Sequence, residues 1–257
     1  MRDDPPVHVT HLERVLGLTW PGIHSEPFGG WLLRAGRGVT SRANSALVLG
    51  DPGVPTEEAL DAVAAWYRTR GLPPRLQIAA SIAACGSLTE AEGGDHGRRE
   101  VTDAACARRG WVASPWTWVM TRPLDGEPDA AGDQTVGLGD LEVAWSGEPP
   151  PTWSPERAAE ATAAPALFAT VRLHGEAAGV GRLALAEDWA VLTDLTVEPQ
   201  VRGRGIGGAV VEALCRRAKA ERATAVALQV LADNPARRLY RRLGFSDHHA
   251  YRYRTGG

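Results

Sequence analysis

The sequence lacks most of what marks secreted, membrane or nucleic-acid-binding proteins. It has only three cysteines, which form neither a C-x-x-C pair nor an even disulfide set. No run approaches the roughly 18 apolar residues of a membrane-spanning helix, and no apolar segment resembles a signal peptide. The net charge is -3, without the basic excess that binds a phosphate backbone. We therefore expect a soluble, reduced, cytoplasmic protein with no membrane and no nucleic acid as partner.

Lysine is also scarce, because Lys219 is the only lysine among 28 basic residues, a bias typical of a GC-rich bacterial genome. The remaining composition is that of a globular protein, with 44% hydrophobic and 23% charged residues. This balance excludes a disordered, collagen-like or coiled-coil chain. The length of 257 residues exceeds a usual single domain, so we expect two domains.

An acidic segment rich in proline and glycine divides the chain. Residues 123–134 show no apolar periodicity, and we interpret them as a linker between an N-terminal domain at 1–122 and a C-terminal domain at 135–257. Hydrophobic patterns predict the order αββαβαβ before this linker and βαβββαβαβ after it. The two orders are similar enough to suggest a diverged internal duplication.

The predicted boundaries follow from turn residues and helix-capping residues. Before the linker, we expect elements at 8–16, 30–35, 43–49, 56–71, 76–79, 99–109 and 111–121. After it, we expect them at 136–145, 154–164, 167–173, 177–185, 189–197, 205–221, 223–230, 235–243 and 249–254. Thr56 is the expected cap of the helix that it begins.

The most informative stretch runs from a strand through a glycine-rich turn into a helix. Glycines there let the main chain approach a ligand closely, and the unpaired N–H groups of the first helical turn suit a pyrophosphate. Two arginines of the turn add positive charge. A tight turn that only begins a helix is the alternative interpretation. The residues concerned are Leu195, Thr196, Val197, Arg202, Gly203, Arg204, Gly205, Ile206, Gly207 and Gly208.

A second segment with clear boundaries follows further along the chain. Asn234 and Pro235 favour the start of a short helix, and Gly244 favours its end. Tyr240 lies at the edge of the apolar stripe of this helix. A buried tyrosine is more often a core residue with a bonded hydroxyl than a catalyst, so Tyr240 alone would indicate little.

Taken together, these two segments resemble the GNAT superfamily of acyl-CoA-dependent N-acyltransferases. The first motif stands as Arg202-Gly203-Arg204-Gly205-Ile206-Gly207, and the second as Asn234, Leu239, Tyr240, Gly244 and Phe245. The resemblance covers residues 136–254 and implies an α/β (α+β) fold with a mixed, mostly antiparallel sheet flanked by helices. It implies two such domains in tandem, because the runs at 30–34 and 42–45 are similar to the N-terminal part of a bacterial GNAT subgroup. Prolines at 52 and 55 stand where N–H donors would be needed, so the N-terminal half looks degenerate.

The resemblance implies an N-acetyltransferase in which a primary amine attacks the thioester of acetyl-CoA directly, in a ternary complex. Acetyl-CoA would be a co-substrate, and no metal is implied. The main chain of 195–197 would bind the pantetheine arm, the backbone of 203–208 the pyrophosphate, and Asn234 the arm or a bound water. Tyr240 would protonate the leaving thiolate, because phenol and thiol pKa values differ by only about 1.5 units.

The general base and the acceptor remain open. Some relatives carry a glutamate five residues before the Asn motif, where this chain has Gln229. Asp194 resembles an acidic residue that polyamine acetyltransferases use near their amine, so it is our candidate for binding the acceptor amine or for removing its proton through a water; an ordinary strand-edge aspartate fits equally well. The acceptor would be a small-molecule or peptide amine, and a homodimer is compatible with the family.

Two other functions fit parts of the sequence. Gly203, Gly205 and Gly208 also satisfy the G-x-G-x-x-G of dinucleotide-binding oxidoreductases, although too few residues follow for the rest of that fold. Gln229 is compatible with a CoA-binding regulatory protein that has lost activity. Motifs for a phosphate loop, a nucleophile elbow or a zinc helix do not occur in the sequence.

Overall fold

The computed structural model describes residues 8–80, 95–124 and 141–257, which form two compact units. Unit 1 consists of Met1–Trp118 together with His248–Gly257, and unit 2 consists of Val119–Asp247. The predicted linker lies outside the described residues apart from Pro123 and Leu124, so the predicted domain limits stay a prediction. The end of the chain, which we assigned to the second domain, contributes its strand to unit 1.

Unit 1 is built on a mostly antiparallel sheet in the order β1-β2-β3-β4-β12, in which the β3–β4 pair is parallel. Its helices are α1 (Val9–Thr19), α2 (Thr56–Arg68) and α3 (Asp95–Arg108). Its strands are β1 (His24–Phe28), β2 (Trp31–Ala35), β3 (Ala46–Val48), β4 (Arg75–Ala80) and β5 (Val112–Ala113). Two further strands, β6 (Thr117–Pro123) and β12 (Ser246–Thr255), each have residues in both units.

The two faces of the unit 1 sheet differ in chemistry. Apolar side chains of β2 and β4 pack with α2 and α3, around a core that includes Leu60 and Tyr67. On the other face, Gln77 donates to Glu13 of α1 (Nε2–Oε2, 2.7 Å), and His249 Nε2 lies 2.7 Å from the other Glu13 oxygen. Burying this carboxylate is tolerable because both of its oxygens have partners.

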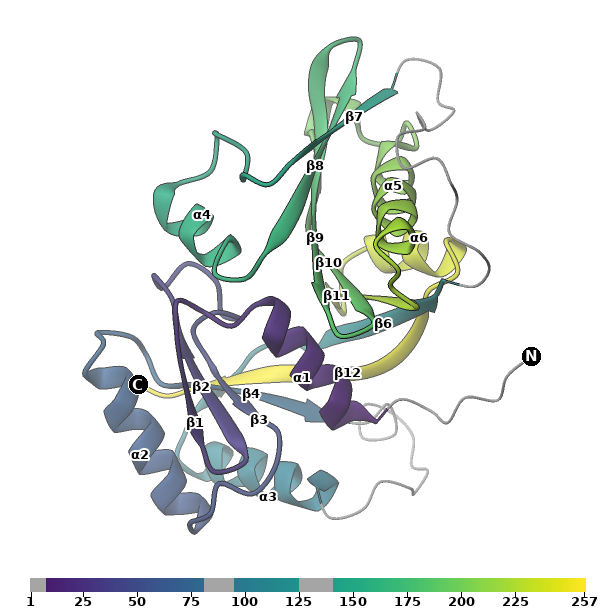
Figure 1. Ribbon diagram of the computed structural model, residues 1–257. Coiled ribbons are helices and arrows are strands. Elements are labelled where there is room, and N and C mark those ends of the chain that lie inside the picture. The colour runs from purple at the N-terminus through teal and green to yellow at the C-terminus, as the bar shows by residue number, and fades with distance from the viewer. Residues whose placement is uncertain (1–7, 81–94, 125–140) are drawn as a thin grey trace. The chain divides into compact units, whose positions relative to one another are not determined.

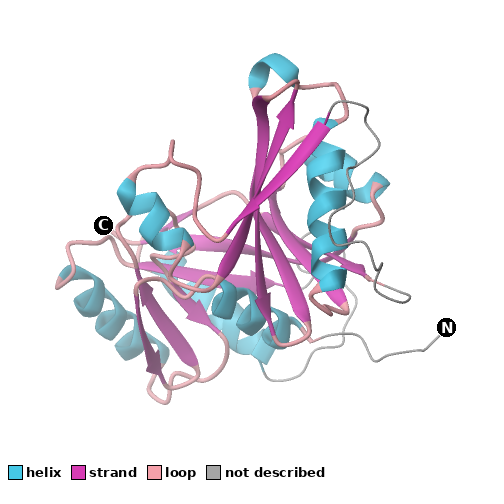
Figure 2. Ribbon diagram, turned by 45° about the horizontal axis from the view of Figure 1, so that its top comes forward, coloured by secondary structure: helices cyan, strands magenta, loops and turns pink. Residues whose placement is uncertain are grey.

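Unit 2 contains an antiparallel series of strands that ends in one parallel pair, in the order β7-β8-β9-β10-β11. The strands are β7 (Leu141–Ser146), β8 (Ala166–Leu173), β9 (Glu176–Ala186), β10 (Trp189–Val197) and β11 (Ala225–Leu231). The helices are α4 (Pro155–Ala161), α5 (Ile206–Ala220) and α6 (Ala236–Arg242). Figures 1 and 2 show α5 on one side of strands β8 to β11 and α4 on the other. Helix α5 packs on β9 and β10, where the absence of a side chain at Gly181 leaves room for Leu214.

This architecture confirms the predicted fold class, a mixed and mostly antiparallel sheet flanked by helices. Both units contain the same step, a strand followed by a helix and a parallel strand, as β3–α2–β4 and β10–α5–β11. Three local predictions were wrong. Pro55, not Thr56, is the cap residue of α2, and no side chain caps that helix. The strand at 111–121 is divided into β5 and β6, and β1 was not predicted.

Part of the predicted strand at 136–145 lies outside the described residues, and the described part, β7, begins at Leu141. Within the described ranges, no helix combines the length and the apolar character needed to cross a membrane.

Candidate active site

Strand β10 separates from β11 before it ends, while it stays paired with β9 as far as Val197. Its parallel pairing with β11 stops at Leu192, opposite Leu228. Its pairing with β9 shifts register around Asp194, whose φ of 53° lies in the left-handed region that few non-glycine residues adopt. On the β11 side, residues 195–197 therefore have no ladder partner within the described chain. Apart from Val197 O, which accepts a hydrogen bond from Arg202, the main-chain groups on that side can pair with an extended ligand.

The glycine-rich turn that follows presents unpaired main-chain donors. Gly203 and Gly205 have φ values of 79° and 81°, a conformation that glycine adopts without steric penalty. The N–H groups of residues 203–208 donate to no acceptor in the described part of the chain, and the first helical bond runs from Ala209 N–H to Gly205 O at 3.1 Å. These donors stand at the positive end of the α5 dipole, an arrangement that suits an anion.

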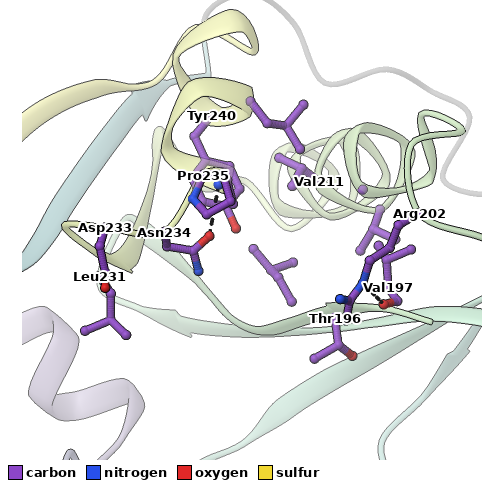
Figure 3. Close-up of a pocket in the computed structure, with 14 residues that line it drawn as sticks. Thr196, Val197, Arg202, Val211, Leu231, Asp233, Asn234, Pro235 and Tyr240 are labelled. Atoms are coloured by element: carbon purple, nitrogen blue, oxygen red, sulfur yellow. Dashed lines mark hydrogen bonds between the residues drawn. The ribbon is translucent and has the colours of Figure 1, made fainter. Parts of the chain in front are cut away.

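A cavity of about 620 Å³ lies between the end of β10, the start of α5 and the segment that enters α6 (Figure 3). This volume is within the usual range for small-molecule sites. Of the predicted site residues, those that line it are Leu195, Thr196, Val197, Arg202, Gly207, Asn234 and Tyr240. Figure 3 shows Tyr240 and Asn234 on one side of this space and Val197 and Arg202 on the other.

Other predicted residues do not line the cavity. They are Asp194, Gly203, Arg204, Gly205, Ile206 and Gly208. Ile206 is 2% exposed and belongs to the core, so only its N–H group is available to a ligand. The Arg202 Nε group donates to Val197 O at 3.0 Å, which ties the turn to the end of β10 (Figure 3).

The sequence analysis did not predict several of the lining residues, which are Val210, Val211, Leu231, Asp233, Pro235 and Ala236. Most are small or apolar, and nothing in a helical or strand pattern distinguishes a cavity wall from a core position. Leu231 is 48% exposed at the end of β11, which is unusual for a leucine at that place and is visible only in the structure.

Tyr240 is buried in the wall of the cavity. It is 7% exposed, and its ring packs edge-on against Phe245 with 6.1 Å between centroids. Its hydroxyl bonds to no described residue, and burial raises the pKa of Tyr240 above its ordinary value. The phenol therefore stays protonated and remains free to donate a hydrogen bond to a ligand.

The oxygen and the nitrogen of the Asn234 side-chain amide have different roles. Its Oδ1 accepts a hydrogen bond from the Ala236 N–H at 2.9 Å and so fixes the start of α6. The Nδ2 group is left as the donor that a ligand can use.

Asp194, the predicted acceptor-binding residue, is already held by an arginine. Its Oδ1 lies 3.1 Å from Nη2 of Arg157 on α4, and the Thr193 hydroxyl is 3.3 Å from its Oδ2. Arg157 in turn lies over the ring of Trp153 at 4.1 Å. The sequence analysis did not predict this partner, which already occupies one oxygen of the carboxylate.

Gln229 lies one residue beyond the last β10–β11 pair. Its Oε1 and Nε2 are both shielded from solvent and have no hydrogen-bond partner in the described part of the chain. A buried amide group without hydrogen bonds costs about 1–3 kcal/mol of stability. We therefore expect a water molecule or a ligand to bond to the Gln229 amide.

This combination of a bulged strand end, a donor-rich helix start and a tyrosine from the next helix belongs to the GNAT class of N-acetyltransferases. The chain belongs to the family described as probable histone acetyltransferase Rv0428c C-terminal, which matches residues 7–254. The protein is therefore an acyltransferase, which disfavours the oxidoreductase interpretation of the glycines.

Individual relatives agree with this assignment. The chain is 26% identical over 263 residues to the uncharacterized N-acetyltransferase YobR of Bacillus subtilis, covering 96% of this chain and 98% of that one. Its fold is similar to that of a GCN5-related N-acetyltransferase from Kribbella flavida, with a TM-score of 0.60 and 17% sequence identity. The match covers 95% of this chain and 96% of that one. The fold is also similar to that of a tandem GNAT protein from the clavulanic acid biosynthesis pathway, with a TM-score of 0.54 and 18% sequence identity. That match covers 99% of this chain and 89% of the other.

Proposed function

We propose that the protein transfers an acetyl group from acetyl-CoA to the primary amine of a small molecule or peptide, by direct attack in a ternary complex. One observation carries this proposal. The free strand end at 195–197, Gly207 in the first turn of α5 and Tyr240 all line the cavity of unit 2, and the unpaired N–H groups of 203–208 lie in the turn that leads into α5. A donor with an extended amide arm, a diphosphate and a thioester matches these three parts in turn.

The residues present fit acetyl-CoA. The unpaired N–H groups of 203–208 suit a diphosphate, and the main chain of 195–197 suits the amides of the pantetheine arm. The Asn234 amide nitrogen offers a further donor beside that arm. When bound, acetyl-CoA supplies the activated acyl group, and the chain's own residues orient it.

Tyr240 supplies the proton that the leaving sulfur needs. The amine nitrogen first adds to the carbonyl carbon. When the C–S bond then breaks, the phenol donates its proton to the departing thiolate, and the proton that the nitrogen loses passes through water to restore the phenol. The raised pKa of Tyr240 keeps this proton in place until the thiolate forms. A main-chain N–H of 195–197 steadies the oxygen of the tetrahedral intermediate.

Gln229 has a binding role in this proposal, because an amide does not take up a proton at neutral pH. Its two unpaired atoms hold a water or the acceptor amine at the point where β10 and β11 separate. Asp194, bonded to Arg157, contributes negative charge on the acceptor side and does not act alone as the base.

Calorimetry and turnover measurements together test the function. We expect coenzyme A to bind with measurable heat, and at least one member of a panel of primary amines to be acetylated when acetyl-CoA is supplied. Absence of coenzyme A binding would contradict the proposal. Binding without turnover of any amine would favour the inactive regulatory protein instead.

The pH dependence of the reaction follows from two groups. The acceptor amine must be neutral to attack, and an ordinary primary amine has a pKa of about 10.4, so the rate should rise with pH. Tyr240 must be protonated, and burial raises its pKa, so its loss of a proton begins only above its ordinary value of about 10. We expect kcat/KM to rise steadily to about pH 9. A decline between pH 8 and about pH 9 would indicate another proton donor.

A further inference from the structure

Helix α3 of unit 1 carries a buried arginine, Arg99, that forms no ion pair with any described residue. Arg99 is 2% exposed, and its Nε and Nη1 atoms are shielded from solvent without a hydrogen-bond partner in the described ranges. Its Nη2 donates to the hydroxyl of Thr10, which is a neutral acceptor. Burying a charge without a counter-ion is expensive, so an arginine held in this way is typical of a site that an anion completes.

Arg99 lines a cavity of about 180 Å³. Apolar surface comes from Ile78, Ala79 and Ala80 at the end of β4, and from the Trp116 ring. An engineered apolar cavity of about 150 Å³ holds benzene, whereas drug-sized ligands need about 300 Å³ or more. The volume therefore suits a compact organic molecule and excludes a nucleotide or coenzyme A.

The acidic residue Asp103 lines this cavity, but its carboxylate is already bonded to two other arginines. Asp103 accepts hydrogen bonds from Arg252 at 3.0 Å and Arg254 at 2.9 Å. Burial alone would raise the pKa of Asp103, but these bonds outweigh it and lower that pKa, so the carboxylate is ionised. One carboxylate thus serves two guanidinium groups, and within the described ranges none forms an ion pair with Arg99. Glu100 also lines the cavity and is exposed.

We propose that this cavity binds a small organic monocarboxylate, whose anionic group pairs with the Arg99 guanidinium and whose apolar body lies against β4 and Trp116. The apolar lining favours a carboxylate on a hydrophobic body over a strongly hydrated inorganic anion. The site belongs to unit 1, which the proposed acetyl transfer does not use. It gives the degenerate half of the chain a ligand of its own.

Ligand-observed NMR and calorimetry on the full chain, with benzoate as the probe, test this site. Benzamide has the same shape without the charge, and inorganic phosphate has charge without the apolar body. We expect benzoate to bind with a dissociation constant on the order of 1 mM or lower, and the other two to bind at least tenfold more weakly. No benzoate binding at about ten times that concentration, or equal binding of benzamide or phosphate, would overturn the proposal.

Three substitutions locate the binding. Arg99→Gln removes the charge, and Ala104→Leu places a larger side chain at the exposed cavity wall of α3, where leucine is a good helix former. Both should weaken benzoate binding at least tenfold. Arg108→Gln, which removes an exposed arginine from the same helix, should leave it unchanged. If the Arg99→Gln variant unfolds, the Ala104→Leu variant still tests the site. If Ala104→Leu is folded and binds benzoate as tightly as the unsubstituted protein, benzoate binds elsewhere and the proposed site is refuted.

Discussion

Replacement of Tyr240 by phenylalanine is expected to lower kcat by more than tenfold while the dissociation constant of acetyl-CoA stays nearly unchanged. The substitution removes one hydroxyl from the cavity wall and keeps the ring that packs on Phe245. No described residue bonds to that hydroxyl, so no structural hydrogen bond is lost with it. General acid catalysis typically contributes about 10²–10⁴ in rate, which sets the scale of the loss.

The measurement separates catalysis from binding, because kcat is followed with saturating acetyl-CoA and affinity is followed by calorimetry. Tyr67→Phe is a matched control, since it also removes a buried hydroxyl, one that donates to Arg34 O at 2.8 Å in unit 1. The control should lower stability and leave kcat unchanged. A Tyr240→Phe enzyme with wild-type turnover would remove Tyr240 from the mechanism.

The sequence predicts the site-bearing elements better than the rest of the fold, and the reason is local. Helix α5 is bounded by Gly205, and α6 follows Pro235 and ends before Gly244, so chain chemistry marks their limits. Strand β1 has no such signal, because His24–Phe28 is mostly exposed, contains a proline and lacks apolar alternation. A strand at an exposed edge owes its existence to its partner rather than to its own residues.

Pairings between distant segments lie beyond such reasoning. The strand at 249–254 was predicted, yet nothing local shows that Tyr253 pairs with Gln77 and Tyr251 with Ala79 in unit 1. The ion pair between Arg157 and Asp194 likewise joins α4 to β10 across a long sequence separation. The pattern therefore predicted which residues carry the motif, and it missed the arginine of α4 that pairs with Asp194.

The second large effect is expected at Gly203, where an added methyl group should raise the dissociation constant of coenzyme A at least tenfold. Gly203 has a φ of 79°, and a Cβ built there meets no atom within 4 Å, so Gly203→Ala causes no clash within the protein. The substitution has two effects. It makes the left-handed backbone conformation less favourable by about 1–2 kcal/mol, and its methyl group hinders the approach of a ligand to the N–H groups of the turn. A diphosphate bound by those groups would be displaced by both effects.

Gly175→Ala separates the two effects. Gly175 has a φ of 83° in the turn between β8 and β9, and its Cβ would also meet no atom within 4 Å. Both variants should therefore lose similar stability in thermal unfolding, whereas only Gly203→Ala should weaken coenzyme A. Acetyl-pantetheine, which lacks the diphosphate, should be used equally well by both variants. If Gly203→Ala instead binds coenzyme A as tightly as Gly175→Ala does, the turn does not hold the diphosphate. A methyl group placed in a turn that binds the diphosphate should weaken coenzyme A more than the same methyl group placed at Gly175.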